Sequence, residues 1–455
     1  MSELDLNPAR GSVQPQRTAP FIDRDALVEL YLQNRRTTQW LFDLLHPDAY
    51  YERPIALRQP VVFYEGHLAG FAVNILLKGA LGRAGIDESL ELLFARGIDP
   101  DSPQDVTQQS WPSREVVSDY VTAATDAVVD ALRHEDFGSV TDPENRRLMA
   151  AWTIVEHDPM HHETLLYMWH QLDPALKRRP AELRPSPSEP GSLGNTTVDV
   201  PHGLATLGAD RRELRFGWDN EFPSEQVAVP SFQIDRYNVT NGDFLKFVEA
   251  GGYQNSALWT DSEWRWLNDS EKRHPTFWVD RGGQWYWRGM FEEVPLPSTW
   301  PVWVSQAEAT AYARWSGRRL PTEAEFHRAA FGTPEGGENL FPWGNARPEP
   351  RHGNFDLQRL DPVPVGSYPD GVSAWGIHDL IGNGWEWTST IFAPFKGFAP
   401  MITYPVYSTD FFDDMHFVLK GASPATSVLH IRRSFRNWFR PNYPYVYAGF
   451  RTVAM

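Results

Sequence analysis

The chain has 455 residues, of which 41% are hydrophobic and 22% are charged, a composition typical of a globular protein of about two or three domains. A net charge of −17 argues against binding to nucleic acid or anionic membranes, and the absence of cysteine excludes disulfides, thiolate metal sites and cysteine nucleophiles. No apolar run reaches the ~18 residues that span a bilayer, and residues 1–20 lack a signal-peptide pattern, so we expect a cytoplasmic protein with no membrane contact.

Residues 20–172 are predicted to form a four-helix bundle. Apolar residues recur at spacings of three and four over residues 25–45, 61–81 and 114–133, and again from a turn at 141–144 to residue 172. Ser113 is in position to cap the third of these helices.

Residues 173–195 are predicted to be a linker, because this proline-rich stretch cannot bury enough apolar surface to become ordered. From residue 196 to 455 the helical pattern fades, and glycine, proline and tryptophan separate short segments. Two short helices are expected, one over residues 305–316 with a serine cap and one in which Thr322 and Glu325 fit a capping box. The rest indicates an α+β domain held together by buried indoles.

The fourth helix carries two histidines that could bind one metal ion. His157 and His161 are four residues apart, so they differ by about 40° around the helix and share a face. Glu163 lies about 200° from His161, which favours a role in supporting a ligand histidine rather than in binding the ion. His162 and His170 do not share the face and are interpreted as non-ligands.

His67 lies in an apolar stretch of the second helix, where a lone histidine is commonly a hydrogen-bonded core residue. A bundle is, however, a place where facing helices assemble metal sites. On the residues alone, the three imidazoles could hold zinc, iron, nickel or copper and leave positions open for substrate, or the helical pair could be a polar helix face.

These histidines, with Gly66 and Leu68 around the first of them, resemble the iron site of the DinB-type domain in sulfoxide synthases of ergothioneine biosynthesis. The second half resembles the formylglycine-generating-enzyme fold, a C-type-lectin-like domain. The matching segments are residues 317–325, 341–345, 365–369, 375–387 and 448–451. Since formylglycine-generating enzymes use cysteines, their own activity is excluded here. The two domains in this order are the architecture of the sulfoxide synthases.

The resemblance implies an oxidoreductase in which Fe(II) on His67, His157 and His161 works with O₂, hercynine and a sulfur nucleophile. Asn437 and Trp438 resemble the pair that receives the trimethylammonium group of hercynine, and an indole face suits a quaternary ammonium. A buried structural tryptophan is the alternative. Tyr404 and Tyr407 resemble the tyrosine pair beside the iron, of which Tyr404 would supply a proton; the alternative is two loop aromatics.

Three residues depart from the branch that uses γ-glutamylcysteine. Phe439 and Tyr443 stand where that branch has the Asp and Arg that hold the charged peptide ends, and Met160 stands where it has a Gln that helps hold hercynine. A charged substrate would lose its ion pairs here, whereas aromatic faces suit a sugar ring.

These departures, with residues 63–71 and 93–100, make the chain resemble the selenoneine synthases, which couple hercynine to a selenosugar. The implied reaction is formation of a C–Se bond on the imidazole ring. One alternative is an ergothioneine- or ovothiol-type sulfoxide synthase that joins cysteine or another thiol to hercynine or histidine. Others are a zinc-dependent thiol transferase and a lectin-like binding module with a structural bundle. The sequence leaves selenium against sulfur open, because a selenolate and a thiolate need similar pockets.

Overall fold

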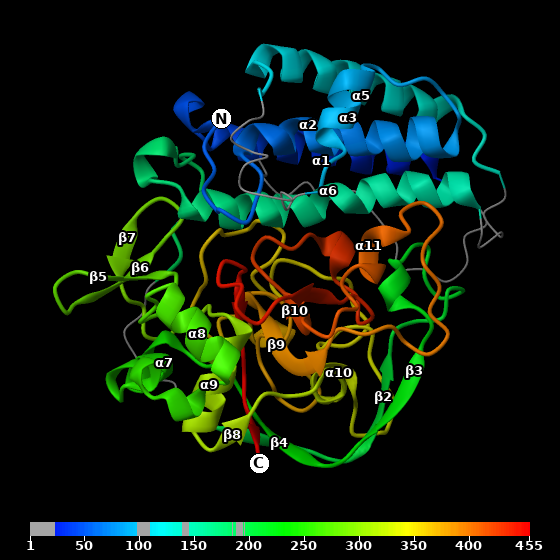
Figure 1. Ribbon diagram of the computed structural model, residues 1–455. Helices are drawn as coiled ribbons and strands as arrows, with labels where there is room; N and C mark the ends of the chain where they lie inside the picture. Colours follow the sequence, from blue (N-terminus) through cyan, green and yellow to red (C-terminus); the bar gives the residue numbers. More distant parts are fainter. Residues whose placement is uncertain (1–22, 98–109, 139–144, 184, 188–193, 195) are drawn as a thin grey trace. The chain divides into compact units, whose positions relative to one another are not determined.

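The computed structural model describes residues 23–97, 110–138, 145–183, 185–187, 194 and 196–455 (Figure 1). Contacts divide the chain into two compact units. The first comprises the chain up to Glu182 together with Arg212–Phe216 and Met401–Pro405. The second comprises Leu183–Arg211, Gly217–Pro400 and Val406–Met455.

The first unit is built from helices, which are α1 (Arg24–Asp43), α2 (Val61–Ala72), the π-helix η3 (Val73–Ala80), α3 (Glu88–Phe94), α5 (Arg114–His134) and α6 (Arg146–Gln171), with the short turns η2 (Pro47–Ala49) and η4 (Pro174–Leu176). Helix α1 packs on α5 and α6, and α2 packs on α3, α5 and α6 (Figure 1). The predicted bundle of four long helices is confirmed. Two details were not predicted: the second helix continues as a π-helix within its expected range, and α3 is an additional short helix.

The ends of the bundle helices follow local capping rules. Ser113 caps α5 as predicted, its side chain accepting a hydrogen bond from the amide of Val116. Asn145 caps α6 in the same way through the amide of Leu148, while the turn expected at 141–144 lies outside the described residues. Helix α6 runs through Pro159 without ending, so it carries His157 and His161 on one continuous element.

The second unit mixes helices and strands, which confirms the predicted α+β character. Its helices are α7 (Asn241–Glu249), α8 (Asp261–Asp269), α9 (Gln306–Trp315), α10 (Glu323–Phe331) and α11 (Val406–Thr409), with the 3-10 turns η5 (Asp219–Glu221), η6 (Gly252–Gln254), η7 (Ser256–Leu258), η8 (Pro369–Gly371) and η9 (Val428–His430). The serine cap expected at Ser305 and the capping box expected for Thr322 with Glu325 are present, and Ser305 also forms a capping box with Glu308, which was not predicted.

Four small sheets complete the second unit. Their strands are β1 (Thr197–Val200), β2 (Gly203–Leu207), β3 (Glu225–Val229), β4 (Phe232–Asp235), β5 (Trp278–Asp280), β6 (Trp285–Arg288), β7 (Glu293–Pro295), β8 (Arg318–Arg319), β9 (Gly384–Ile391), β10 (Phe417–Ala422), β11 (Asn437–Phe439), β12 (Ala448–Gly449) and β13 (Val453–Ala454). The strand orders are β1-β4-β13-β8, β11-β10-β9-β12, β2-β3 and β5-β6-β7. All neighbours are antiparallel except β12 and β9.

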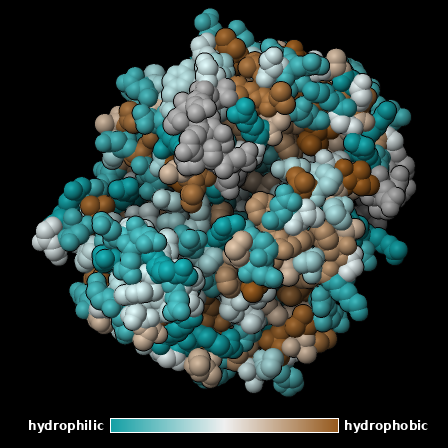
Figure 2. Space-filling view, in the orientation of Figure 1, coloured by the Kyte–Doolittle hydropathy of each residue, from teal (hydrophilic) through white to brown (hydrophobic). Residues whose placement is uncertain are grey.

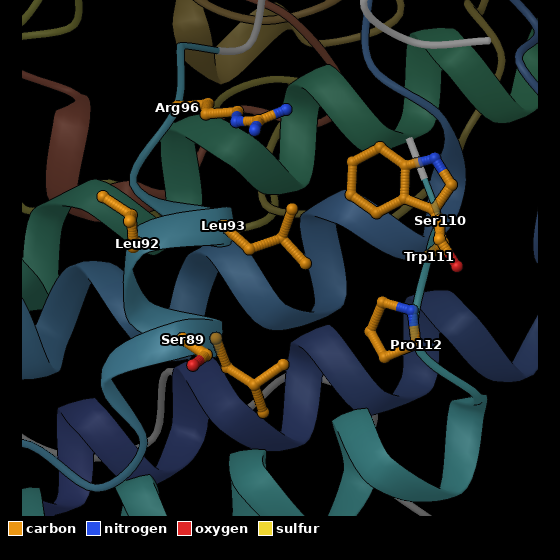
Figure 3. A pocket seen from close by; sticks show the side chains of 8 residues that line it. Ser89, Leu92, Leu93, Arg96, Ser110, Trp111 and Pro112 are labelled. Carbon is orange, nitrogen blue, oxygen red and sulfur yellow. The ribbon is translucent and has the colours of Figure 1, made fainter. Parts of the chain in front are cut away.

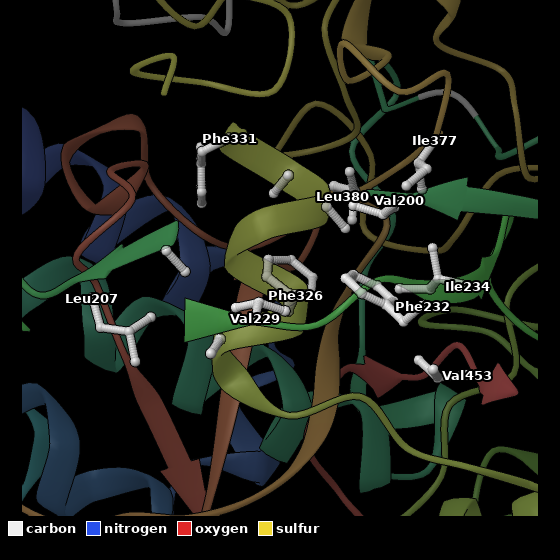
Figure 4. Packing of buried hydrophobic residues seen from close by; sticks show 14 of the residues in the cluster. Val200, Leu207, Val229, Phe232, Ile234, Phe326, Phe331, Ile377, Leu380 and Val453 are labelled. Atoms are coloured by element: carbon white, nitrogen blue, oxygen red, sulfur yellow. The ribbon is translucent and has the colours of Figure 1, made fainter. Parts of the chain in front are cut away.

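Helix α10 lies at the centre of a hydrophobic core in the second unit. Phe326 and Phe331 of this helix pack with strand residues such as Phe232 and Ile234 (Figure 4). The expected buried indoles are also present, since Trp287, Trp303, Trp385 and Trp387 are all buried. Arg451 and Glu386 form a fully buried ion pair with 2.6 Å between Nη2 and Oε1, which ties the end of the chain to β9.

Hydrogen bonds hold residues 185–187 of the proline-rich stretch, a local order that its composition did not predict. Within the second unit, Trp300 Nε1 donates to the carbonyl of Pro187 at 2.8 Å, and Arg359 Nη1 donates to the carbonyl of Pro185 at 2.9 Å. Ser186 Oγ in turn donates to the carbonyl of Asp361 at 2.9 Å. Residues 184, 188–193 and 195 of the predicted linker lie outside the described residues.

Polar and apolar residues are mixed over the face of the molecule drawn in Figure 2. Figure 2 shows a mostly hydrophilic face on which hydrophobic residues form small, separate groups. Among the described residues, no helix combines the length and the apolar character that crossing a bilayer requires.

Candidate metal centre and aromatic cluster

Helices α2 and α6 bring His67, His157 and His161 together inside the first unit. One ring nitrogen from each histidine lies within 4.8 Å of the others, and all three side chains are buried. The closest pair of nitrogens is Nε2 of His157 and Nε2 of His161, which are 3.0 Å apart. Within the described residues, these three form the one group with a metal-ligand arrangement.

Burial keeps the three imidazoles neutral. It lowers the pKa of His67, and it lowers the pKa values of His157 and His161 well below the usual histidine range, with the neighbouring imidazoles adding to the effect. His67 Nδ1 lies 2.7 Å from the carbonyl oxygen of Phe94. Because a carbonyl can only accept, Nδ1 carries the proton and Nε2 keeps its lone pair.

The donor set fits a divalent transition metal. Two nitrogens bound to one ion at about 2.1 Å and at right angles to each other would lie about 3 Å apart, which matches the separation in the helical pair. Three neutral imidazoles suit iron, zinc, copper or nickel and leave coordination positions open. The Nδ1 atoms of His157 and His161 have no hydrogen-bond partner within the described residues.

Aromatic rings enclose the histidines. Phe71 stacks on His157 with 3.5 Å between ring centroids and 3° between planes, and Phe63 stacks on His67 at 4.9 Å. The ring of Tyr404 meets Phe71 edge-on at 5.3 Å. Phe71 had no predicted role of its own, only a place in the segment 63–71 that resembles the selenoneine synthases. Its position four residues after His67, which puts both on one face of the helix, was the signal that could have found it.

Tyr404 reaches the helical unit through the segment 401–405, here called the Tyr404 strap. Thr403 Oγ1 lies 3.0 Å from Thr153 Oγ1 on α6, one turn before His157. This hydrogen bond joins residues 250 positions apart in the chain. The strap therefore places the ring of Tyr404 against Phe71, which stacks on the candidate ligand His157, whereas its predicted companion Tyr407 belongs to the second unit.

A buried ion pair also stands beside the histidines and was not foreseen. Arg35 of α1 pairs with Asp158 of α6, and both side chains are largely buried. Asp158 Oδ1 lies 3.8 Å from His157 Nδ1, so this carboxylate contributes negative charge next to a candidate ligand. The signal in the sequence was an acidic residue directly after the first histidine of the pair.

The remaining residues of α6 take the positions that helical geometry requires. His162 bonds through Nε2 to Thr38 Oγ1 at 2.8 Å, and neither it nor His170 joins the metal-ligand group of the described residues. Glu163 is buried, and Met160 is half-buried directly before His161.

Trp438 lies among aromatic rings in the second unit, in what we call the Trp438 cluster (Phe392, Tyr407, Phe411 and Trp438). Phe392 stacks on the indole at 4.2 Å and 6°, while Tyr407 meets it edge-on at 5.3 Å and Phe411 at 5.5 Å. Asn437 Oδ1 accepts the backbone N–H of Trp438 at 2.9 Å. Trp218, which was not predicted, stacks on Tyr407 at 4.0 Å. One face of the indole is thus covered by Phe392.

Phe439 and Tyr443 form a second aromatic arrangement in the same unit. Their rings stack with 5.1 Å between centroids and 9° between planes, and Tyr445 meets Tyr443 edge-on at 5.4 Å. Two predicted substrate-binding residues are therefore neighbours that present carbon faces rather than charges.

A surface hollow on α3 is lined by other residues. These are Ser89, Leu90, Leu92, Leu93, Arg96, Ser110, Trp111 and Pro112 (Figure 3). None of the residues that the sequence analysis singled out for chemistry lines it.

Comparison with known proteins adds information about ancestry. The family model described as the sulfatase-modifying factor enzyme 1-like domain matches residues 184–455. A hercynine oxygenase of Mycolicibacterium thermoresistibile is 36% identical over 336 residues, covering 71% of this chain and 71% of that protein. One of Mycobacterium tuberculosis is 34% identical over 390 residues, covering 81% and 88%. Ergothioneine biosynthesis protein 1 of Schizosaccharomyces pombe is 30% identical over 458 residues, covering 91% and 54%.

Proposed function

This chain belongs to the hercynine oxygenase family and carries a sulfatase-modifying factor enzyme 1-like domain, and on that premise we propose that it joins hercynine to a selenosugar in an Fe(II)- and O₂-dependent reaction. A C–Se bond would replace a C–H bond of the hercynine imidazole ring, and O₂ would accept the two electrons and two protons lost from the ring carbon and the selenol. The observation that carries the choice of partner is the stacked pair Phe439 and Tyr443.

The ion would be held by His67, His157 and His161. Their neutral, buried nitrogens are suited to Fe(II), which when bound would supply the redox chemistry with O₂. The rings of Phe63 and Phe71 cover the faces of two of these imidazoles, so they hold the ligand planes and limit the access of water.

Trp438 would bind the trimethylammonium group of hercynine. A quaternary ammonium has no N–H to donate, and an aromatic face attracts it through the ring quadrupole. Since Phe392 covers one face of the indole, the cation would use the other, with the ring of Tyr407 as a second wall. Asn437 would hold the backbone of Trp438 in place through its 2.9 Å hydrogen bond.

Tyr404 would donate a proton from its phenol to oxygen that is reduced in the reaction. A phenol is a suitable general acid where water is limited, and the bond between Thr403 and Thr153 fixes the strap on which Tyr404 lies. Tyr407 would then serve as a wall for the bound cation, because its ring meets Trp438 edge-on at 5.3 Å.

The second substrate would be a weakly charged, ring-shaped molecule. An amino-acid or peptide substrate needs ion pairs for its charged ends, because an unpaired charge is costly to bury. The parallel rings of Phe439 and Tyr443 instead offer apolar faces, and Met160 offers no amide. A selenosugar meets these requirements.

A thiol is the second candidate for the nucleophile. The relatives named as ergothioneine biosynthesis proteins favour it, and a thiolate would fit wherever a selenolate fits. In this alternative the chain would be a sulfoxide synthase that uses cysteine or another small thiol.

A competition experiment separates the two candidates. Protein reconstituted with Fe(II) without oxygen receives hercynine, then equal amounts of selenosugar, cysteine and γ-glutamylcysteine, and then air, and the products are read by mass spectrometry. We expect a hercynine adduct with the isotope pattern of selenium. A sulfur adduct alone would support the thiol candidate and contradict the selenium proposal.

A further inference from the structure

We propose that α3 is a positioning element for the metal centre: the carbonyl of Phe94 sets the tautomer and the ring orientation of His67, and Gly66 is required so that Phe94 can come close enough to do so. This inference rests on the proposed function in taking His67 as a metal ligand. It assigns a positioning role to Gly66, which has no side chain, and to the backbone carbonyl of Phe94.

The hydrogen bond itself is well placed to control His67. Phe94 is the last residue of α3, so its carbonyl is one of the helix-end acceptors that have no partner inside the helix. It is also at the negative end of the helix dipole, which favours a donor. His67 Nδ1 donates to it at 2.7 Å in a fully buried environment. The proton is thereby held on Nδ1, and the lone pair of Nε2 stays available for a metal ion.

The approach of α3 to α2 depends on the missing side chain at Gly66. A Cβ atom at Gly66 would meet three atoms of the Phe94 ring, the farthest of them, Cδ2, at 2.5 Å, which no real structure tolerates without a shift. Phe94 has no exposed surface into which its ring could retreat. One turn later, a Cβ at Gly70 would meet Phe94 Cβ at 3.5 Å and Tyr120 Oη at 3.4 Å, which are ordinary contacts. The two glycines therefore form a matched pair.

Glu91 anchors α3 to the helix that carries His67. Its Oε1 accepts the amides of Ile86 at 2.6 Å and Asp87 at 3.2 Å, and its Oε2 accepts Lys78 Nζ at 2.9 Å. Lys78 belongs to η3, the continuation of α2, and Glu91 is only 1% exposed. The carboxylate thus links α3 to η3, and Phe94 links α3 to His67. Helix α3 is therefore attached to the helix that carries His67 at two points.

The test is a titration of the metal-free protein with Co(II), a spectroscopic substitute for Fe(II), in which affinity and the ligand-field spectrum are both recorded. Wild type, Gly66→Ala, Gly70→Ala and His67→Ala are compared, with circular dichroism to show that each variant is folded. Alanine favours helix over glycine at both positions, so helix propensity cannot weaken the site. We expect Gly66→Ala to bind Co(II) about 10- to 100-fold more weakly than wild type, the loss typical when a ligand histidine loses its hydrogen-bond partner. Its ligand-field spectrum should also change. Gly70→Ala should match wild type in both affinity and spectrum.

A compensating change separates positioning from general damage. In Gly66→Ala/Phe94→Leu the smaller side chain makes room for the new methyl group while the backbone carbonyl stays, so affinity and spectrum should return toward those of wild type. Wild-type affinity in Gly66→Ala, or equal losses in both glycine variants, would overturn the inference.

Two further variants keep the result interpretable. If Gly66→Ala does not fold, Glu91→Gln loosens α3 without touching α2 and should also weaken Co(II) binding; unchanged affinity would count against the inference. If His67→Ala binds Co(II) as wild type does, the ligand assignment in the proposed function fails, and the inference about α3 fails with it. If His67→Ala loses binding while Gly66→Ala keeps it, the proposed function stands and only the role of α3 is rejected.

Discussion

Two of the proposed site residues each have an aromatic ring packed against them. His157 has Phe71 stacked at 3.5 Å, and Trp438 has Phe392 stacked at 4.2 Å. In each case one face of the ring is covered by a hydrocarbon face, which restricts its rotation. The ring nitrogens of His157 lie in the ring plane and are not covered by this stack, while the indole of Trp438 keeps its second face. Such preorganisation lowers the entropy that binding would otherwise cost.

Replacing Trp438 tests the ammonium contact. Trp438→Ala removes the indole face, and a cation–π contact of about 0.5 to 2 kcal/mol corresponds to a KM for hercynine about 2- to 30-fold higher. Trp438→Phe should recover part of the loss because it keeps an aromatic face. Steady-state kinetics with varied hercynine give the answer, and an unchanged KM in Trp438→Ala would reject this contact.

The aromatic pair is expected to set the choice of nucleophile. The double change Phe439→Asp and Tyr443→Arg introduces the two charges that recognise a charged peptide, so kcat/KM should fall for the selenosugar and rise for γ-glutamylcysteine, changing their ratio by about 10-fold or more, the equivalent of one net charged hydrogen bond. The ratio is measured in the competition assay described above. An unchanged ratio would show that Phe439 and Tyr443 do not contact the nucleophile.

At the scale of elements, the Tyr404 strap connects distant parts of the sequence. Thr153 on α6 also donates to the carbonyl of Met149 at 2.8 Å, so its hydroxyl links the helix backbone to Thr403. These two hydrogen bonds hold the strap in a fixed position on α6, the helix that carries two of the candidate ligands.

Thr153→Val should uncouple this strap at nearly constant volume. The lost hydrogen bond is worth about 1 kcal/mol, so kcat should fall roughly 5-fold, while the affinity for Co(II) stays at the wild-type level because no candidate ligand has moved. Turnover assays and metal titration are run on the same preparation. Equal activity of Thr153→Val and wild type would show that the strap needs no such anchor.

Elements with local signals could be predicted from the sequence, and elements that depend on distant partners could not. The caps of α5, α9 and α10 were foreseen because a serine or threonine bonds a backbone amide three residues away. Helix α3 was missed although Asp87 caps it through the amides of Ser89 and Leu90, because its seven residues are too few for a periodic pattern. The π-helix η3 was missed because apolar spacing does not distinguish it from the end of an α-helix.

The candidate site divides in the same way. Helical spacing placed His157 and His161 together, and the family resemblance added His67. The structure brings all three into one group. The strap contact between Thr403 and Thr153, the stack of Phe71 and the carbonyl of Phe94 each depend on residues far apart in the chain or on backbone atoms, so no pattern in the sequence marks them.

At the scale of the whole molecule, buried charge makes stability depend on pH. Burial raises the pKa of Asp379 to about 6, although the nearby Arg451 opposes the shift. A raised carboxyl pKa means that the folded state favours the protonated form. The contribution of protonated Asp379 to the stability of the folded state is therefore full below the usual carboxyl pKa near 4, and this contribution is lost as the pH rises through about 6.

Asp379→Asn should remove this pH dependence. Asparagine keeps an acceptor for the amide of Gly366, which lies 2.6 Å from the carboxylate, and it tolerates the positive φ of 54° at this position. We expect the midpoint of thermal unfolding to rise by on the order of 5 °C at pH 7 and to match wild type near pH 4. Thermal melts at several pH values test this, and a variant less stable than wild type at pH 7 would show that the charged carboxylate stabilises the fold.

The most direct test of the account is the oxygen uptake of protein reconstituted with Fe(II), measured with and without hercynine and nucleophile, for wild type and His157→Ala. The account predicts that wild type consumes O₂ only when Fe(II) and both substrates are present, and that His157→Ala neither retains iron nor consumes O₂. Substrate-dependent uptake by His157→Ala, or by wild type without iron, would contradict the claim that these three histidines hold the ion that drives the reaction.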